Sequence, residues 1–137
     1  MKKLITICLL IAISFTATAQ QLSTGIYTVS ISKLTYSNIS GDIYGNKYSG
    51  TQIEGKYTIK KNGTTMVSQD FTFMQLSEFT ATLNLKENER SGNTLTYDYE
   101  SKKFELAEEE YKAKKTKTKE DLILSGVLVY AQWLDEE

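Results

Sequence analysis

The stretch TQIEGKYTIKKNGTTMVSQDFTF, residues 51–73, contains two segments of alternating apolar and polar residues separated by Asn62-Gly63. Alternation with a period of two is typical of β-strands that are buried on one face. Asn-Gly favours a type I′ turn, because both central residues of that turn need positive φ. The stretch therefore predicts an antiparallel hairpin, which decides the fold class expected for the chain.

The same alternation continues on both sides of this hairpin. It covers GIYTVSISKL (25–34), EFTATLNL (78–85) and TLTYDY (94–99), and Phe104 and Leu106 begin a further strand. The links between these segments are shorter than the crossovers that parallel strands require. We therefore expect an antiparallel β-meander of about six strands, with one apolar face and one threonine-rich face in water.

The chain changes character towards its C-terminus. AEEEYKAKK (107–115) consists of helix-forming residues with Glu–Lys pairs four positions apart, and DLILSGVLVYAQWL (121–134) is apolar around most of a helix. Thr118 and Asp121 resemble a capping box. We expect a helical segment at about 107–135, packed on the apolar face of the sheet, which makes the fold class α+β. Residues 121–134 also fit a strand, so that alternative stays open.

The lysine-rich stretch YKAKKTKTKED (111–121) has five lysines, but residues 105–121 also contain six acidic residues. Because the opposite charges nearly cancel, this region predicts a solvated helix and hinge rather than a site for an anionic partner.

The N-terminus has the three parts of a secretory signal peptide. A start with Lys2 and Lys3 is followed by the apolar segment 4–15 and by the small-residue cleavage site Ala-Thr-Ala at 17–19. The apolar segment is shorter than the roughly 20 residues that span a bilayer. We therefore expect residues 1–19 to be removed near Ala19. Residues 20–137 then form one β-rich domain, exported to the periplasm or the medium, with no stable membrane insertion.

Composition argues against several chemistries. The chain has no histidine, and its one cysteine, Cys8, lies in the expected signal peptide. The usual general base, thiol nucleophiles and thiolate metal sites are therefore not expected, and neither is a cofactor. The net charge of −1 argues against nucleic acid as the main partner. Two acidic pairs, Glu54 with Asp70 and Asp98 with Glu100, are the best candidates for the carboxylates of a glycosidase. Acidic residues are expected on a polar sheet face in any case, so we expect no enzyme.

The best candidates for ligand contact are Tyr44 and Tyr48. Both lie in SGDIYGNKYSG (40–50), a glycine-punctuated connection between two predicted strands. Aromatic side chains in a loop can stack on a sugar or dock a protein partner. The alternative is that this stretch is a short strand or hairpin whose tyrosines pack on the rim of the sheet.

One short motif resembles a known family. TGIYTV (24–29) is similar to the Gly-x-Trp start of lipocalins, with Gly25 at the family's glycine and Tyr27 where the family has tryptophan. The resemblance implies a barrel that carries a small apolar ligand. Its pocket would be lined by aromatic residues of the apolar face: Tyr27, Tyr57, Phe71, Phe73 and Tyr97.

Three functions remain as hypotheses. The first is a small exported, non-enzymatic binding protein whose partner is a protein or a small molecule such as a carbohydrate. The second is the lipocalin-like carrier. The third is an assembly protein that forms a homodimer through its apolar C-terminal segment.

Overall fold

The computed structural model describes residues 20–114 and 116–136, and the expected signal peptide lies outside them. The elements are β2 (Gln20–Thr24), β3 (Tyr27–Ile43), β4 (Asn46–Lys61), β5 (Thr64–Gln75), β6 (Thr80–Lys86), β7 (Gly92–Asp98), β8 (Lys103–Leu106), β9 (Glu109–Lys112) and α2 (Lys119–Glu136). The strands form one antiparallel sheet in sequence order. The antiparallel meander with a C-terminal helix is therefore confirmed, although the described part has eight strands instead of about six.

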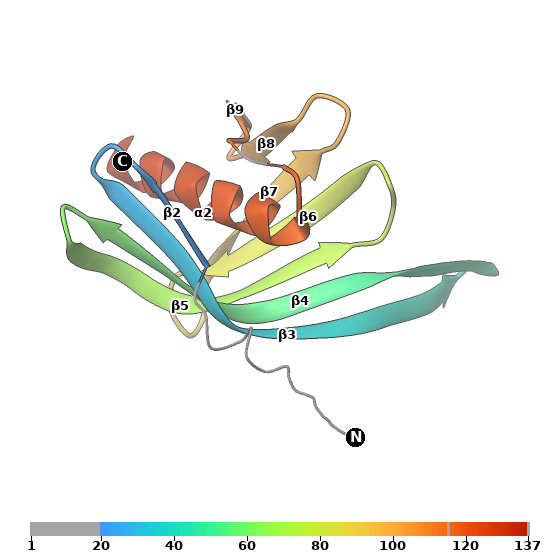
Figure 1. Cartoon of the computed structure of the whole chain (residues 1–137). Coiled ribbons are helices and arrows are strands. Elements are labelled where there is room, and N and C mark those ends of the chain that lie inside the picture. Colours follow the sequence, from blue (N-terminus) through green and yellow to red (C-terminus); the bar gives the residue numbers. More distant parts are fainter. Residues whose placement is uncertain (1–19, 115, 137) are drawn as a thin grey trace, which may run out of the picture.

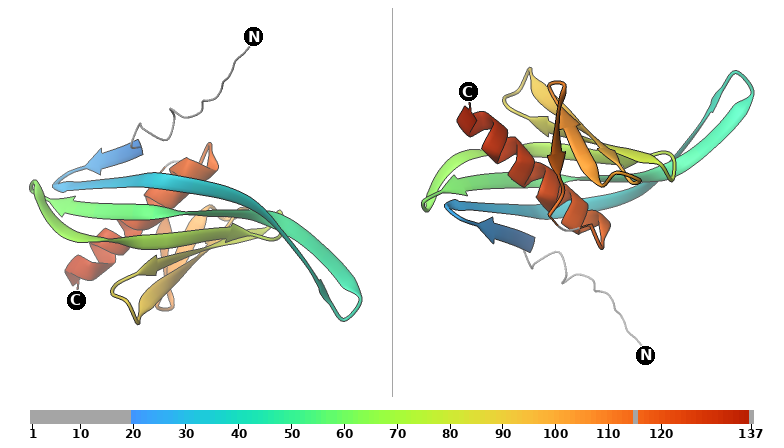
Figure 2. Two further views of the ribbon diagram at one scale, coloured as in Figure 1. Left: turned by 90° about the horizontal axis from the view of Figure 1, so that it is seen from below. Right: turned by 90° about the horizontal axis from the view of Figure 1, so that it is seen from above.

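The sheet curls into a half-barrel, and α2 lies on its concave side (Figures 1 and 2). The helix contacts β2 and β3 at one end of the sheet and β8 near the other. Because the sheet wraps around it, α2 is buried on every face from Leu122 to Ala131. Gly126 permits the close approach: a Cβ at this position would lie 2.5 Å from Cδ2 of Leu83 on β6.

The helix starts later than the sequence predicts. Residues 109–112, expected to be helical, form β9, because Ala107 and Glu108 make a two-residue turn with φ of 54° and 68°. This turn places Tyr111 opposite Phe104, so that Tyr111 packs against the core. Packing of this kind outweighs the local helix propensity of a short segment.

The second half of the C-terminal prediction is confirmed. Residues 121–134 are helical, so the strand alternative is wrong. Thr118 caps the helix, since its Oγ1 accepts a hydrogen bond from the N–H of Asp121 at 3.0 Å. The lysines before the cap are exposed where the structure describes them, as a solvated surface predicts, but the segment is a strand end and a loop rather than a helix.

The end of α2 is fastened to the sheet by Asp135. Its carboxylate accepts hydrogen bonds from Nζ of Lys61, at 2.8 Å, and from the hydroxyl of Tyr27. Hydrogen bonding by Lys61 and then Tyr27 lowers the pKa of Asp135 below its ordinary value. The same contact, together with burial, raises the pKa of Tyr27 to about 12.

These contacts predict a loss of stability in acid. The pKa of Asp135 is lower in the folded chain than in the unfolded chain. The ionised carboxylate therefore stabilises the fold fully at any pH above its pKa in the unfolded chain, and this stabilisation is lost as the pH falls through its pKa in the folded chain. We expect Asp135→Asn to lower the Tm at neutral pH, and the difference from the unchanged protein to shrink as the pH falls below 3.8. Circular dichroism melts at a series of pH values measure this. A difference that stays constant into acid would show that the ionised carboxylate contributes nothing.

Candidate functional site

The hairpin of β3 and β4 extends beyond the rest of the sheet. The last residue of β5, Gln75, pairs with Thr51, and Thr51 in turn pairs with Asn38. Beyond this point residues 39–50 form a two-stranded ribbon, which we call the arm, with no strand beside it in the described part of the chain. Figures 1 and 2 show the arm projecting from the half-barrel. The described core contains no residue of the arm.

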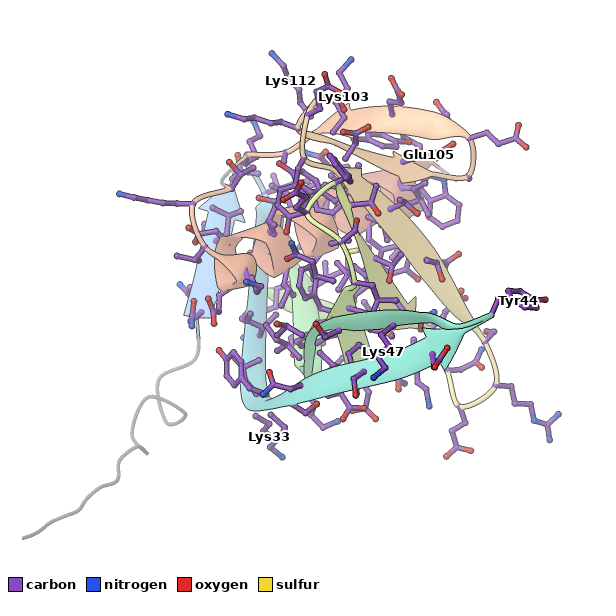
Figure 3. The ribbon with its side chains drawn as sticks, turned by 90° about the vertical axis from the view of Figure 1, so that its right-hand side faces the viewer. Lys33, Tyr44, Lys47, Lys103, Glu105 and Lys112 are labelled. Atoms are coloured by element: carbon purple, nitrogen blue, oxygen red, sulfur yellow. The ribbon has the colours of Figure 1, made fainter. Side chains whose placement is uncertain are left out.

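A bulge bends β3 at the base of this extension. Between Ser32 and Thr35 the register shifts, so that two β3 residues stand opposite Gly55, and Lys33 has a φ of 56°. A Cβ on Gly55 would lie 2.7 Å from the carbonyl oxygen of Ser32, so only glycine fits the inside of the bend. Figure 3 shows Lys33 where the strand bends and Tyr44 at the far end of the arm.

Tyr44 occupies the tip of the arm. With Gly45 it forms a two-residue turn, and the φ angles of 53° and 83° are those of a type I′ turn. The left-handed conformation costs a residue such as tyrosine roughly 1–2 kcal/mol, whereas asparagine or glycine adopts it routinely. The Tyr44 side chain is 99% exposed, so no packing within the described chain offsets that cost. The prediction that Tyr44 packs on the rim of the sheet is therefore wrong.

Tyr48 lies on the other strand of the same arm. In β4 it pairs with Gly41 of β3, the third residue pair from the turn that contains Tyr44. Its side chain is outside what the structure describes. The stretch 40–50 is thus a continuous hairpin, which is one of the two conformations that the sequence left open.

One side of the arm is hollowed and polar. Ser40 and Asp42 from β3, with Lys47 and Ser49 from β4, line a depression of about 520 Å³. A second depression of about 500 Å³ shares Ser49 and continues along the base of the arm, where it is lined by Gly50, Thr51, Gln75, Leu76, Ser77, Glu78, Phe79 and Lys119. We call these two depressions together the arm groove. Hydroxyl groups and charges of both signs dominate its outer half, which suits a ligand that forms hydrogen bonds.

Phe79 is a candidate contact residue that the sequence misplaced. The alternation of residues 78–85 predicts Phe79 on the buried face with Ala81, but its side chain is 67% exposed. Ser77 explains this, because its Oγ accepts hydrogen bonds from the N–H groups of Phe79 and Thr80 and turns the chain just before β6. Phe79 consequently borders the inner end of the arm groove. Local alternation could not reveal this, because Phe79 precedes the start of the strand.

Tyr36 connects β3 to the start of α2 near this groove. Its hydroxyl donates a hydrogen bond to the Glu120 carboxylate. Partial burial, followed by the contact with Glu120, raises the pKa of Tyr36. The hydroxyl therefore stays protonated near neutral pH and acts as a hydrogen-bond donor that ties strand to helix.

The residues expected to line a carrier pocket lie in the core. All are at most 8% exposed and belong to one buried cluster with α2: Tyr27, Tyr57, Phe71, Phe73 and Tyr97. The Tyr57 ring meets the Tyr130 ring of α2 edge to face, with centroids 6.2 Å apart. The helix thus occupies the volume in which the lipocalin resemblance would place a ligand. The apolar surface of α2 is buried against the sheet of its own chain. It is therefore covered on the faces that a homodimer through the C-terminal segment would need.

The acidic pairs have ordinary structural surroundings. Asp70 forms an ion pair with Lys56 at 3.5 Å, while Glu54 stands opposite Thr72 rather than another acid. Asp98 accepts hydrogen bonds from the N–H groups of Glu100 and Ser101 at the turn before β8. Within the described residues, no three side chains of the metal-binding types are grouped to hold an ion.

The fold and site together define an antiparallel half-barrel that encloses a C-terminal helix and carries a projecting two-stranded arm. No family model, curated protein or solved structure matches the chain. None of the helices within the described residues has the length and apolar character needed to cross a membrane.

Proposed function

We propose that this chain is a small exported, non-enzymatic binding protein that contacts a partner protein through its arm. The observation that carries the proposal is the conformation of Tyr44, a fully exposed aromatic residue held in a left-handed turn where asparagine would be unstrained. Strained backbone conformations that no packing within the fold offsets are concentrated at functional positions. Large aromatic side chains are also the residues that contribute most to protein interfaces.

Two further features of the arm support this function. The arm contributes nothing to the described core, so its length is not explained by folding. The arm groove lies beside it and continues to Phe79, a second exposed aromatic residue. A partner that contacts Tyr44 could therefore extend along the arm and reach Phe79. Tyr48, in the same arm, remains the second proposed contact residue.

The substitution Tyr44→Asn tests this function. Because asparagine tolerates the left-handed turn, we expect the free energy of unfolding to stay the same or to rise by up to about 1 kcal/mol. Partner binding should weaken at least about tenfold. The measurements are urea unfolding and affinity capture, by immobilised protein, of proteins from the medium and periplasm of the native host, compared by quantitative mass spectrometry.

Ile26→Asn is the matched control, since Ile26 is an exposed apolar residue in the two-residue turn between β2 and β3. It should leave the captured partner unchanged. If Tyr44→Asn unfolds the protein, the tyrosine has a structural role. If both variants capture the same proteins as the unchanged chain, the tip of the arm is not the contact.

A further inference from the structure

Within residues 20–114 and 116–136, the outer edge of β3 is unpaired over much of its length. β2 pairs with β3 only as far as Ile31, where Gln20 is its partner, whereas β3 continues to Ile43. From Thr35 to Ile43 the edge that faces away from β4 has no strand beside it in the described residues. We call residues 35–43 the free β3 edge.

The register identifies the main-chain groups on this edge. Ile43 and Asn46 flank the turn, and the pair beside a two-residue turn is hydrogen-bonded across the hairpin. In an antiparallel pair such residues alternate with residues whose N–H and C=O point away from the partner strand. The outward-pointing groups therefore belong to alternate residues of the free β3 edge: Tyr36, Asn38, Ser40 and Asp42.

The two terminal strands of the sheet are short, whereas the free β3 edge is nine residues long. β9 is four residues long, three of them charged, and β2 is five residues long. Short strands, charges and prolines are the usual means by which proteins stop an edge from pairing with another chain. The free β3 edge has one charged residue, Asp42, and no lysine or proline. It is therefore open to the addition of a strand.

We propose that the free β3 edge pairs with the same edge of a second copy of this chain, in antiparallel orientation about a two-fold axis. The arm alone is a two-stranded ribbon, which is marginally stable in water, and pairing two arms makes a four-stranded sheet. A two-fold axis requires a self-complementary surface. With Ile39 opposite Ile39, the outward groups of Tyr36 meet those of Asp42, and those of Asn38 meet those of Ser40. In this register neither Asp42 faces another acidic residue.

This dimer does not depend on the partner contact proposed for Tyr44. Tyr44 lies in the turn, beyond the last residue of the free β3 edge. Tyr44→Asn should therefore leave dimer formation unchanged even where it abolishes partner capture. The two proposals can consequently fail separately.

Sedimentation equilibrium and amide hydrogen exchange test the dimer. We expect the average mass to rise from monomer to dimer with concentration, and the exchange of the Asn38 and Ser40 amides to slow in parallel. The Ile39 amide, which points to β4 in monomer and dimer alike, should slow less than the Asn38 and Ser40 amides. If the average mass stays that of a monomer up to a protein concentration of about 1 mM, the dimer proposal is wrong. It is equally wrong if the edge pairs with an extended segment of another protein, because the chain alone would then also remain a monomer.

Ser40→Pro removes an outward N–H that has no partner strand within the described residues, and proline is tolerated at such edge positions. We expect it to raise the dissociation constant of the dimer at least about tenfold, while Ser40→Ala, which keeps the N–H, behaves as the unchanged protein. If the Pro variant dimerises normally, the edge is not the interface. If the Pro variant distorts the arm, the proposal is tested by the unchanged protein alone, through the slowing of Asn38 and Ser40 amide exchange with concentration.

Discussion

A chain that ends at Asp121 should show no cooperative unfolding transition. The truncation removes the run Leu122–Ala131, which is buried throughout and fills the concave side of the half-barrel. Burial of a large apolar side chain contributes about 1.5–3 kcal/mol. The seven leucine, isoleucine, valine and tyrosine residues of this run therefore contribute roughly 10–20 kcal/mol, which is comparable to the whole net stability of a domain, about 5–15 kcal/mol. The apolar face of the sheet would also be exposed to water.

The measurement is differential scanning calorimetry together with near-ultraviolet circular dichroism. A chain that ends at Leu134 is the control, because it keeps the buried run and loses Asp135 with its contacts to Lys61 and Tyr27. We expect this control to unfold cooperatively with a moderately lower Tm. If the chain ending at Asp121 also melted cooperatively near the full-length temperature, α2 would not be part of the core.

Tyr130→Ala should cost about 3–5 kcal/mol of unfolding free energy, the range measured for large aromatic residues removed from cores. Tyr130 is completely buried, and its ring packs against those of Tyr57 and Trp133 with centroids 6.2 Å and 5.9 Å away. It is therefore the point where the helix and the centre of the sheet share aromatic contacts. The loss comes from removed contacts and from the cavity that is left behind. Urea unfolding, with the slope checked for change, measures it.

Tyr130→Phe separates the ring from the hydroxyl. The Tyr130 hydroxyl accepts a hydrogen bond from the side-chain amide of Asn93 at 3.1 Å. Because Asn93 is only half-buried, its amide can bind water instead, and we expect a loss of about 1 kcal/mol. Equal losses for the Ala and Phe variants would mean that the hydroxyl, rather than the packing of the ring, holds the helix in place.

The strands could be predicted where local pattern and turn chemistry agree. Asn62-Gly63 forms the expected turn, with φ of 53° and 82°, and it joins β4 to β5. The alternation in residues 78–85 correctly buries Ala81, Leu83 and Leu85. The same reasoning failed at residues 107–112. There Ala107 and Glu108 both adopt positive φ without the glycine or asparagine that usually signals such a turn.

The candidate site was only partly accessible to the same reasoning. Tyr44 could be selected because an aromatic residue stands between polar and glycine residues in a connection. Its neighbours could not, because the arm groove joins residues from three separate regions, exemplified by Ser49, Phe79 and Lys119. Which residues face that groove depends on where β5 ends, at Gln75, and on the bend opposite Gly55.

Local sequence was sufficient to predict three kinds of element in this protein: the alternating strands, the Asn62-Gly63 turn and the capped apolar helix. These depend on side-chain periodicity and turn propensity, which act over a few neighbouring residues. Three other features became evident from the folded chain alone: the sheet curls around α2, β3 and β4 extend beyond the neighbouring strands, and Phe79 is exposed. The physical reason is that each of these depends on pairing and packing between residues far apart in the chain, whose free energies local propensity does not contain.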